Sequence, residues 1–495
     1  MISALKTGKD IRPLQTPQVL ILSGLTLGAL ADRLWVENGF LGAGFVVWAS
    51  LFAGAANAIT IWRTGALSRE LLAWSALGVC AALLLVFRSA PFVIPALLLL
   101  TLTSAAMGMM QTNGRSLRDT DIIEHLRSLG RVPRKALLAT APLLARLELG
   151  LYIRSPRLRT ALRGLLLALP LLVLFSLLFA SADAAFSHYA ERFFTLLQQD
   201  ALEHLLIIGI LAWLSTGLLA GVSERHYLVE RKTRRLLMLG TEDTAVLLGM
   251  LVLLFLGFVA LQLGYLFGGA ELIQHSAGLT VAEYARRGFF EMVIASALSL
   301  IILVAVARSD CNPRVFRPLG AILLACVAIM LISAAQRMAL YVTEFGLSLD
   351  RMAAIAVMIW LAGVLLLFTG TLLMGRQRDF AAGVTLAGVF VVLLWALLNP
   401  AAIVARVNLD RTLQDQQPLD TAYLQWMGTD AVPTLMNRFE LLPQDAQCQL
   451  MPWLRQYELP YREDWRWWSA SRAAATKAVQ KNAPELDTIA ESCGR

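Results

Sequence analysis

The segment AEYARRGFFEM places charged side chains immediately before a long apolar run, VIASALSLIILVAVA. Glu283, Arg287 and Glu291 are spaced i, i+4 and i+8, so they share one helix face along which opposite charges alternate. Tyr284 and Arg286 lie beside this stripe. Such a group can form ion pairs within the protein. Alternatively, its arginines can bind the carboxylate or phosphate of a ligand through paired hydrogen bonds.

Three other polar groups lie in SADAAFSHYAER, SAAQRMALYVTEFGLSLDR and NPAAIVARVNLDR. Their ionisable and amide side chains are Asp183, His188, Glu191, Arg192, Arg337, Tyr341, Glu344, Arg351, Asn399, Arg406, Asn408 and Arg411. Arg337, Tyr341 and Glu344 are spaced i, i+4 and i+7 and share a helix face. His188 and His275 lack the further ligands that a metal site needs, and the chain has no metal or nucleotide motif. We therefore expect no metal and no cofactor.

The elements that position these groups are apolar helices. The chain has 495 residues, of which 57% are hydrophobic and 16% are charged, whereas soluble proteins have about 25% charged residues. A run of about 20 apolar residues spans a bilayer as a helix. Such segments occur at about 18–34, 40–62, 70–87, 91–110, 162–180, 202–221, 244–267, 288–307, 319–341, 352–374 and 380–398. The sequence therefore predicts an all-α, polytopic transmembrane bundle of eleven spans, the first of which is retained rather than removed as a signal peptide.

Basic residues mark one side of the predicted bundle. Segment 111–163 carries 11 Lys/Arg against 4 Asp/Glu, and the loops 222–243, 308–318 and 375–379 are also basic. The alternate loops are poor in basic residues, apart from the one that precedes residue 288. By the positive-inside rule the basic segments face the cytoplasm, which accounts for the net charge of +8 without a nucleic-acid partner. We therefore expect a plasma-membrane protein with its N-terminus in the cytoplasm and its C-terminal domain outside.

This topology predicts four parts of the chain. They are four transmembrane helices at 1–110, a basic cytoplasmic segment at 111–161, a seven-helix transmembrane core at 162–398 and an outside helical domain at 399–495. In the basic segment, leucines at 137, 138, 144 and 147 alternate with Arg134, Lys135 and Arg146, a pattern that predicts a basic amphipathic helix. That helix either lies on the inner leaflet and recognises lipid or a partner, or is a solvated helix that only fixes the topology.

The outside domain has a different composition. It is nearly neutral, with 10 Lys/Arg and 12 Asp/Glu. Asp420 and Asp430 are predicted as N-cap residues of short helices, and a longer helix is predicted near 462–481. An aromatic group at the start of that longer helix, formed by Trp465, Trp467 and Trp468, either fills the core of the small domain or rests on the outer membrane surface. We expect them in the core.

The cysteines predict one disulfide bond. Cys80 and Cys326 lie in spans and Cys311 lies in a cytoplasmic loop, so we expect these thiols to be free. Cys448 and Cys493 both lie in the outside domain, where an oxidising compartment preserves disulfides. Their bridge would close a loop of about 45 residues and stabilise the domain by about 3–4 kcal/mol.

The predicted topology brings the four polar groups to one side of the membrane at a similar depth. An ionisable residue inside a span costs roughly 2.5–3.5 kcal/mol, so it usually faces the protein interior and has a partner. The groups form either a salt-bridge network that fastens helix ends and docks the C-terminal domain, or an outward-facing pocket for a polar or anionic ligand. The sequence does not choose between these interpretations.

Four sequence blocks resemble a known family. EYARRGFFEM, QRMALYVTEFGLSLDR, NPAAIVARVNLDR and LDTAYLQWMGTDAVPTL are similar, in this order, to the shared blocks of a bacterial multi-pass membrane family, domain of unknown function four-one-seven-three, with its four-one-five-three relative. The resemblance covers roughly residues 170–440 and leaves out the first four spans. It implies a bacterial inner-membrane protein without assigned catalytic residues. Matching positions are Glu283, Tyr284, Arg286, Gly288, Arg337, Tyr341, Arg351, Asn399, Arg406, Asn408, Asp420 and Tyr423.

We favour a non-catalytic envelope protein, sensor-like or an assembly component, whose outward-facing pocket binds an envelope protein or an anionic ligand beside the lipid bilayer. The candidate binding residues are Glu283, Tyr284, Arg286, Arg287, Glu291, Arg337, Tyr341, Glu344, Arg351, Asn399, Arg406, Asn408, Asp420 and Tyr423. One alternative is a transporter or lipid-handling protein, although the chain has no evident inverted repeat. The other is a membrane-embedded transferase acting on an envelope lipid, with Glu283, Glu291 or Glu344 as general base.

Overall fold

The computed structural model describes residues 16–36, 42–112, 122–145, 200–223, 240–267, 289–309, 311–372, 377–415, 417–459 and 464–493, with a few single positions between these ranges. Within them every regular element is helical, and ten helices are long and apolar enough to cross a membrane. The all-α, polytopic bundle predicted from the sequence is therefore confirmed. The remaining predicted span, 162–180, lies almost entirely outside the described residues.

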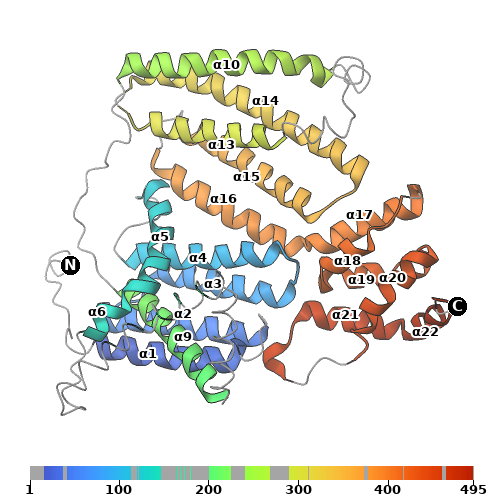
Figure 1. The fold of residues 1–495 in the computed structure, drawn as a ribbon. Helices are drawn as coiled ribbons and strands as arrows, with labels where there is room; N and C mark the ends of the chain where they lie inside the picture. The colour runs from blue at the N-terminus through green and yellow to red at the C-terminus, as the bar shows by residue number, and fades with distance from the viewer. Residues whose placement is uncertain are drawn as a thin grey trace, which may run out of the picture.

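The spanning helices form two packed groups (Figure 1). The first contains α1 (Thr16–Ala31), α2 (Ala43–Thr64), α3 (Arg69–Phe87), α4 (Val93–Thr112) and α9 (Asp200–Ser223). The second contains α10 (Thr241–Phe267), α13 (Phe289–Val306), α14 (Pro313–Phe345), α15 (Leu349–Leu372) and α16 (Gln377–Leu398). Each group has its own apolar core, around Met107 and Leu219 in the first and around Leu323 and Phe368 in the second. The groups meet where α16 packs against α4.

Most neighbouring spans run in opposite directions, although α10 and α14 pack on each other in the same direction, and the helix ends gather on two sides of the bundle (Figure 1). One side, which we call the domain end, holds the α1–α2, α3–α4 and α14–α15 connections and the end of α16, next to the C-terminal helices. The opposite side, which we call the basic end, holds the starts of α3, α10, α14 and α16. Arg69, Arg314 and Arg317 are exposed there.

The C-terminal part is a set of short helices that shares a core with the bundle. It comprises α17 (Pro400–Asp415), α18 (Thr421–Trp426), α19 (Val432–Met436), α20 (Gln444–Arg455), α21 (Ala470–Lys481) and α22 (Ala483–Cys493), with short turns η5 (Thr429–Ala431), η6 (Phe439–Leu441) and η7 (Trp465–Trp467). Leu85 of α3 and Leu97 of α4 belong to one buried cluster with Leu409, Leu424 and Leu435. These helices therefore cover the bundle and do not form a separate globule.

Two features of this domain bear on the sequence predictions. Cys448 and Cys493, the pair that the sequence predicts, form a disulfide with their Cα atoms 5.5 Å apart. Trp465 and Trp468, however, are exposed and Trp467 is half-buried, so the prediction that this group lies in the core is wrong. The main chain of their turn binds the start of α2, where the Trp468 carbonyl accepts from the Ala43 N–H at 3.1 Å. This contact keeps the rings of Trp465 and Trp468 outside the apolar core.

Two helices of the predicted basic segment lie at the basic end. They are α5 (Ile122–Leu138) and α6 (Thr140–Ala145). α5 packs on α4, α9 and α16 and runs across the bundle helices rather than along them (Figure 1). The residues predicted as one amphipathic helix are divided between the end of α5 and α6, with a break at Ala139. The part of that segment beyond residue 145 lies outside the described residues.

Candidate functional site

The direction of each helix determines which main-chain groups at the domain end need hydrogen-bond partners. The first N–H groups and the last carbonyl groups of a helix have no partner within that helix. The N-terminus therefore favours acceptors and the C-terminus favours cationic donors. The domain end presents the C-termini of α14 and α16 and the N-termini of α2, α4 and α15. We call the polar contact over these ends the domain joint.

Two arginines bind the C-terminus of α14. Arg411 of α17 donates from Nη2 to the Glu344 carbonyl at 2.8 Å and from Nη1 to the Val342 carbonyl at 3.4 Å. Arg351, in the first turn of α15, donates from Nη1 to the Phe345 carbonyl at 3.0 Å and also to the Gly346 carbonyl. The carbonyls that the helix leaves unpaired thus receive charged donors, which also suit the negative end of the helix dipole.

An aromatic ring fixes the position of one of these arginines. The guanidinium carbon of Arg351 lies 4.1 Å from the centre of the Tyr341 ring, and Tyr341 is itself packed edge-on against Phe345. A cation over an aromatic face is stabilised by the ring quadrupole. Tyr341 and Arg351, which the sequence singled out together, therefore act as one unit at the end of α14.

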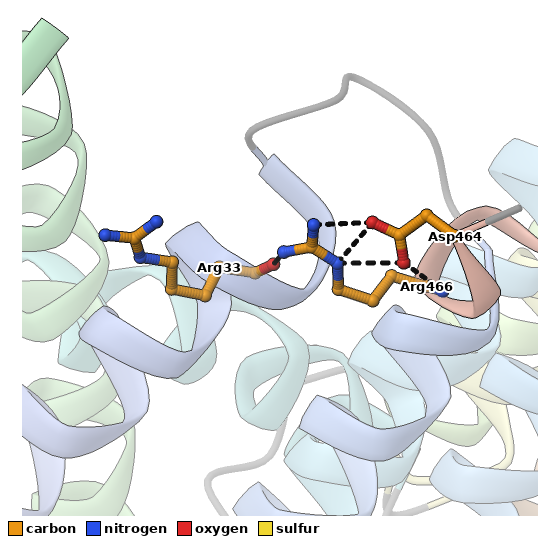
Figure 2. A network of polar contacts seen from close by, with 3 residues as sticks. All are labelled: Arg33, Asp464 and Arg466. Atoms are coloured by element: carbon orange, nitrogen blue, oxygen red, sulfur yellow. Dashed lines mark hydrogen bonds and ion pairs between the residues drawn. The ribbon is translucent and has the colours of Figure 1, made fainter. Parts of the chain in front are cut away.

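Two more arginines of the described chain bind the ends of other helices. Arg88, between α3 and α4, donates from Nη2 to the Leu397 carbonyl at 3.0 Å and from Nε to the Ala396 carbonyl, which closes the C-terminus of α16. Arg466 of η7 donates from Nη1 to the Arg33 carbonyl at 2.6 Å. Figure 2 shows how Asp464 orients this guanidinium, with Nε donating to Oδ2 at 2.7 Å.

A buried carboxylate binds the connection that leads into α4. Asp430 is 4% exposed, and its Oδ2 accepts the Ser89 N–H at 2.7 Å and the Ala90 N–H at 3.0 Å. Its Oδ1 accepts the hydroxyl of Ser471, and Thr429 lies 2.6 Å from both the Ser89 and the Ser471 hydroxyl oxygens. The prediction that Asp430 caps its own helix is therefore wrong. It lies within η5 and binds the main-chain N–H groups of Ser89 and Ala90 in the α3–α4 connection, just before α4 begins at Val93.

The N-terminus of α15 is bound by an amide and a phenol. Asn408 of α17 accepts the Leu347 N–H at 2.9 Å and donates to the Leu347 carbonyl at 2.8 Å. Tyr423 of α18 accepts the Leu349 N–H at 2.8 Å. Burial raises the pKa of Tyr423, although the Leu349 N–H opposes this shift. Asp420 caps α18 as the sequence predicts, accepting the Tyr423 N–H at 2.9 Å.

The structure thus brings together many of the residues that the sequence singled out and leaves others apart. Tyr341, Arg351, Asn399, Asn408, Arg411, Asp420 and Tyr423 lie in or beside the domain joint. Asn399 has a φ of +53° and accepts the Ala402 N–H at 3.2 Å, which starts α17 after α16 ends. Arg337 is half-buried on α14, whereas the side chains of Glu291, Glu344 and Arg406 are exposed.

The remaining candidates cannot be placed. Glu283, Tyr284, Arg286 and Arg287 lie outside the described residues, as do Gly288, Asp183, His188, Glu191, Arg192 and His275. Of the four polar groups predicted from the sequence, two lie in the described joint. One is at the α14–α15 connection and the other is at the α16–α17 connection. The contacts of the joint are mainly between side chains and main-chain groups rather than between opposite charges.

Several residues of this joint were not predicted from the sequence, namely Arg88, Ser89, Asp464 and Arg466. Arg88 and Ser89 lie in FRSAPF between two apolar runs, where a charged residue is an ordinary loop feature. Asp464 and Arg466 are two residues apart, and this spacing signals no particular site. Their role depends on main-chain groups that are distant in sequence. Position at a short connection between two spans is the one signal that could have indicated Arg88.

A buried ionisable pair lies next to the joint. α1 passes into a π-helical turn, η2 (Asp32–Val36), and the buried carboxylate of Asp32 is 2.9 Å from Nδ1 of His204 in α9. The Trp48 indole also donates to the Leu27 carbonyl at 2.9 Å in the last turn of α1. Across the described ranges, no three His, Cys, Asp or Glu side chains gather as a metal site would require.

Comparison with known proteins places the chain in a family. The family described as domain of unknown function (DUF4153) matches residues 71–437. It is the second of the two related families named by the sequence resemblance, and its match reaches back into α3 and α4, which the resemblance leaves out. The matched residues include Arg88, Tyr341, Arg411 and Asp430 of the domain joint. Comparison with curated proteins and with solved structures finds no match. This multi-pass membrane protein therefore belongs to the DUF4153 family, whose function is unknown.

Proposed function

We propose that this chain is a non-catalytic protein of the bacterial inner membrane, sensor-like or an assembly component, in which the C-terminal domain lies outside and holds the helix ends in one arrangement. The domain joint carries this proposal. The domain binds main-chain groups of three connections that are far apart in sequence, at residues 33–43, 88–90 and 342–349. A partner that binds the domain therefore acts on the bundle through several helices at once.

The hydrogen bonds made by the polar side chains of the domain joint support a role without catalysis. A general acid or base must be free to exchange a proton with a substrate. Asp430 is instead buried and accepts three donors, while Arg351 and Arg411 are bound to helix carbonyls. The exposed Arg406, on the same helix as Arg411, remains available to an anionic ligand or an envelope protein. The proposed binding surface is therefore the exposed face of α17.

The charge distribution supports the proposed orientation. Arg69, Arg314 and Arg317 are exposed at the end opposite the domain, and the positive-inside rule assigns such an end to the cytoplasm. The disulfide between Cys448 and Cys493 suits an oxidising compartment. The exposed rings of Trp465 and Trp468, beside the start of α2, suit the membrane–water interface.

A complementation experiment separates this function from the enzymatic and transport alternatives. The gene is replaced by variants, and the sensitivity of the cells to detergent and their envelope-lipid mass profile are measured against a deletion strain. We expect Asp430→Ala, which disrupts the joint, to behave as the deletion does. Glu291→Gln and Glu344→Gln, whose carboxylates are exposed, should complement fully and leave the lipid profile unchanged.

Other outcomes would reject the proposal. If a glutamate variant changes the lipid profile as the deletion does, the protein is a transferase. If the purified protein takes up substrate into liposomes and Glu291→Gln abolishes that uptake, it is a transporter. If Asp430→Ala complements fully although the domain is undocked, the joint has no part in the function.

A further inference from the structure

The amphipathic helix at the basic end has one face fixed on the bundle. His125, Ser128, Val132 and Ala136 of α5 are buried, and this i, i+3, i+7, i+11 spacing follows a single helix face. The His125 ring lies between the Thr120 hydroxyl at 2.8 Å and the Thr385 hydroxyl of α16 at 2.9 Å. Burial lowers the pKa of His125, so this seam is uncharged at neutral pH.

A glycine brings α5 close to the neighbouring span. A Cβ atom added to Gly217 of α9 would lie 2.4 Å from the Lys135 carbonyl oxygen, so no larger residue fits without moving the helix. The Trp213 indole donates to the Leu137 carbonyl at 2.9 Å, and the Thr140 hydroxyl donates to the Trp213 carbonyl at 2.7 Å. These contacts hold α5 across the bundle and determine which side chains point outward.

The outward face combines apolar and basic residues. Leu126, Leu137 and Leu138 are 61%, 56% and 64% exposed, and Arg127 and Arg134 are also exposed. At 100° per residue, Leu126 and Leu137 lie within about 20° of each other, the two arginines follow about 80–100° further round the helix, and Leu138 lies about 20° beyond Arg127. The exposed leucines favour contact with hydrocarbon, whereas the arginines favour water or polar head groups. A lipid–water boundary suits such a face, on which leucines lie on both sides of two arginines.

We propose that α5 is a binding site for the phosphate head groups of anionic phospholipids in the leaflet at the basic end. The leucines enter the acyl-chain boundary, while Arg127 and Arg134 donate paired hydrogen bonds to head-group phosphates. The arginines are seven residues apart, or about 10 Å along the helix, so each binds a separate phosphate. Exposed Arg69, Arg314 and Arg317 add to the positive potential of this end.

The leucines distinguish a lipid from other anionic partners. An acidic protein segment or a nucleic acid would bind Arg127 and Arg134 but would leave the three leucines in water, because its charged surface offers them no apolar contact. The orientation of α5 across the bundle helices (Figure 1) also matches a helix that lies in the plane of the membrane surface.

The contribution of each arginine to the affinity for anionic lipid follows from its charge. A basic residue near an anionic membrane surface contributes about 1 kcal/mol, which is about a fivefold change in affinity. Removing one arginine should therefore weaken the retention of anionic lipid by about fivefold, and removing both by about 25-fold.

The test uses the full chain in nanodiscs made of phosphatidylcholine alone or of phosphatidylcholine mixed with phosphatidylglycerol. Native mass spectrometry measures the preference for retained phosphatidylglycerol, and amide hydrogen exchange measures protection of residues 122–138. We expect slower exchange of α5 in the anionic nanodiscs. The Arg127→Gln/Arg134→Gln double variant should lose both the protection and the lipid preference. Arg127→Lys/Arg134→Lys should retain most of the preference, because the charge remains.

Arg314→Gln is the matched control, because it removes an exposed arginine of the same end from α14 instead of α5. We expect it to weaken retention by no more than about fivefold, well short of the roughly 25-fold loss in the double glutamine variant. Three results would overturn the proposal. They are equal protection of α5 in both nanodiscs, unchanged retention in the double glutamine variant, or an equal loss in Arg314→Gln. The comparison of nanodiscs uses the wild-type chain, so it decides the question even if a variant does not fold.

Discussion

Arginines at the two ends of the bundle have opposite roles. At the domain end, Arg88, Arg351, Arg411 and Arg466 donate to main-chain carbonyls at helix ends. At the basic end, Arg69, Arg127, Arg134, Arg314 and Arg317 are exposed, although Arg63 donates to the Ser223 carbonyl. The last carbonyls of a helix have no partner within that helix and accept a donor that lies within reach. The difference teaches that the position of an arginine relative to a helix end, rather than its residue type, decides what it does in this protein.

The largest effect should come from the buried carboxylate of the domain joint. Asp430→Ala removes three hydrogen bonds to a charged group and leaves the Ser89 and Ala90 N–H groups unsatisfied. We expect it to lower the free energy of unfolding of the C-terminal domain by about 4 kcal/mol. A denaturant titration of the purified protein, followed by tryptophan fluorescence, measures this loss. Glu491→Ala, at an exposed position of α22, should stay within about 0.5 kcal/mol.

The disulfide should have the next largest effect. Replacing Cys448 and Cys493 by serine frees a loop with a sequence separation of 45, which should cost about 3–4 kcal/mol on the chain-entropy account. The same titration measures the loss, and Cys80→Ser, at an exposed free thiol, is the control. Alkylation of intact cells with and without reduction also tests the proposed orientation. If both thiols are found free and protected from the reagent, the domain end faces the cytoplasm.

A pair of arginines on one helix sharpens the comparison between bound and exposed cations. Arg411→Met leaves two carbonyls of α14 without their donor and should cost about 1–2 kcal/mol. Arg406→Met, five residues earlier on α17 and exposed, should change stability by less than about 0.5 kcal/mol. Equal losses would mean that the positive charge of α17, and not the capping of α14, stabilises the joint.

The smallest effect concerns the phenol at the start of α15. Tyr423→Phe removes the acceptor of the Leu349 N–H and should cost about 1 kcal/mol. Because burial raises the pKa of Tyr423 above its ordinary value of 10.0, the native state keeps the proton to a higher pH than the unfolded state does. The contribution of the protonated Tyr423 phenol to the free energy of unfolding is fully present below pH 10 and is lost as the pH rises above that value. Stability of Tyr423→Phe should therefore fall less steeply above pH 10 than that of the wild type.

The spans and part of the joint could be predicted from the sequence, for different reasons. Runs of apolar residues set the spans because the thickness of the bilayer requires a minimum length. Tyr341 and Asn408 could be singled out because polar residues next to an apolar run usually have partners, whereas Tyr423 is indicated only by the family resemblance. Their partners could not be predicted, because main-chain groups such as the Leu347 N–H have no side-chain signature. The exposure of Trp465 likewise depends on how its turn meets α2, a contact between residues more than 400 positions apart.

The core shared by the bundle and the C-terminal helices has a consequence for biogenesis. Leu424 and Leu435 are synthesised after every span of the bundle, yet their apolar partners include Leu85 and Leu97 of α3 and α4. The ribosome therefore releases a segment whose packing surface exists only if the early hairpins have already entered the membrane in the correct direction. A hairpin inserted the wrong way round leaves the last part of the chain uncovered and open to proteases. The last helices to be synthesised can therefore pack fully only when α3 and α4 are already in place.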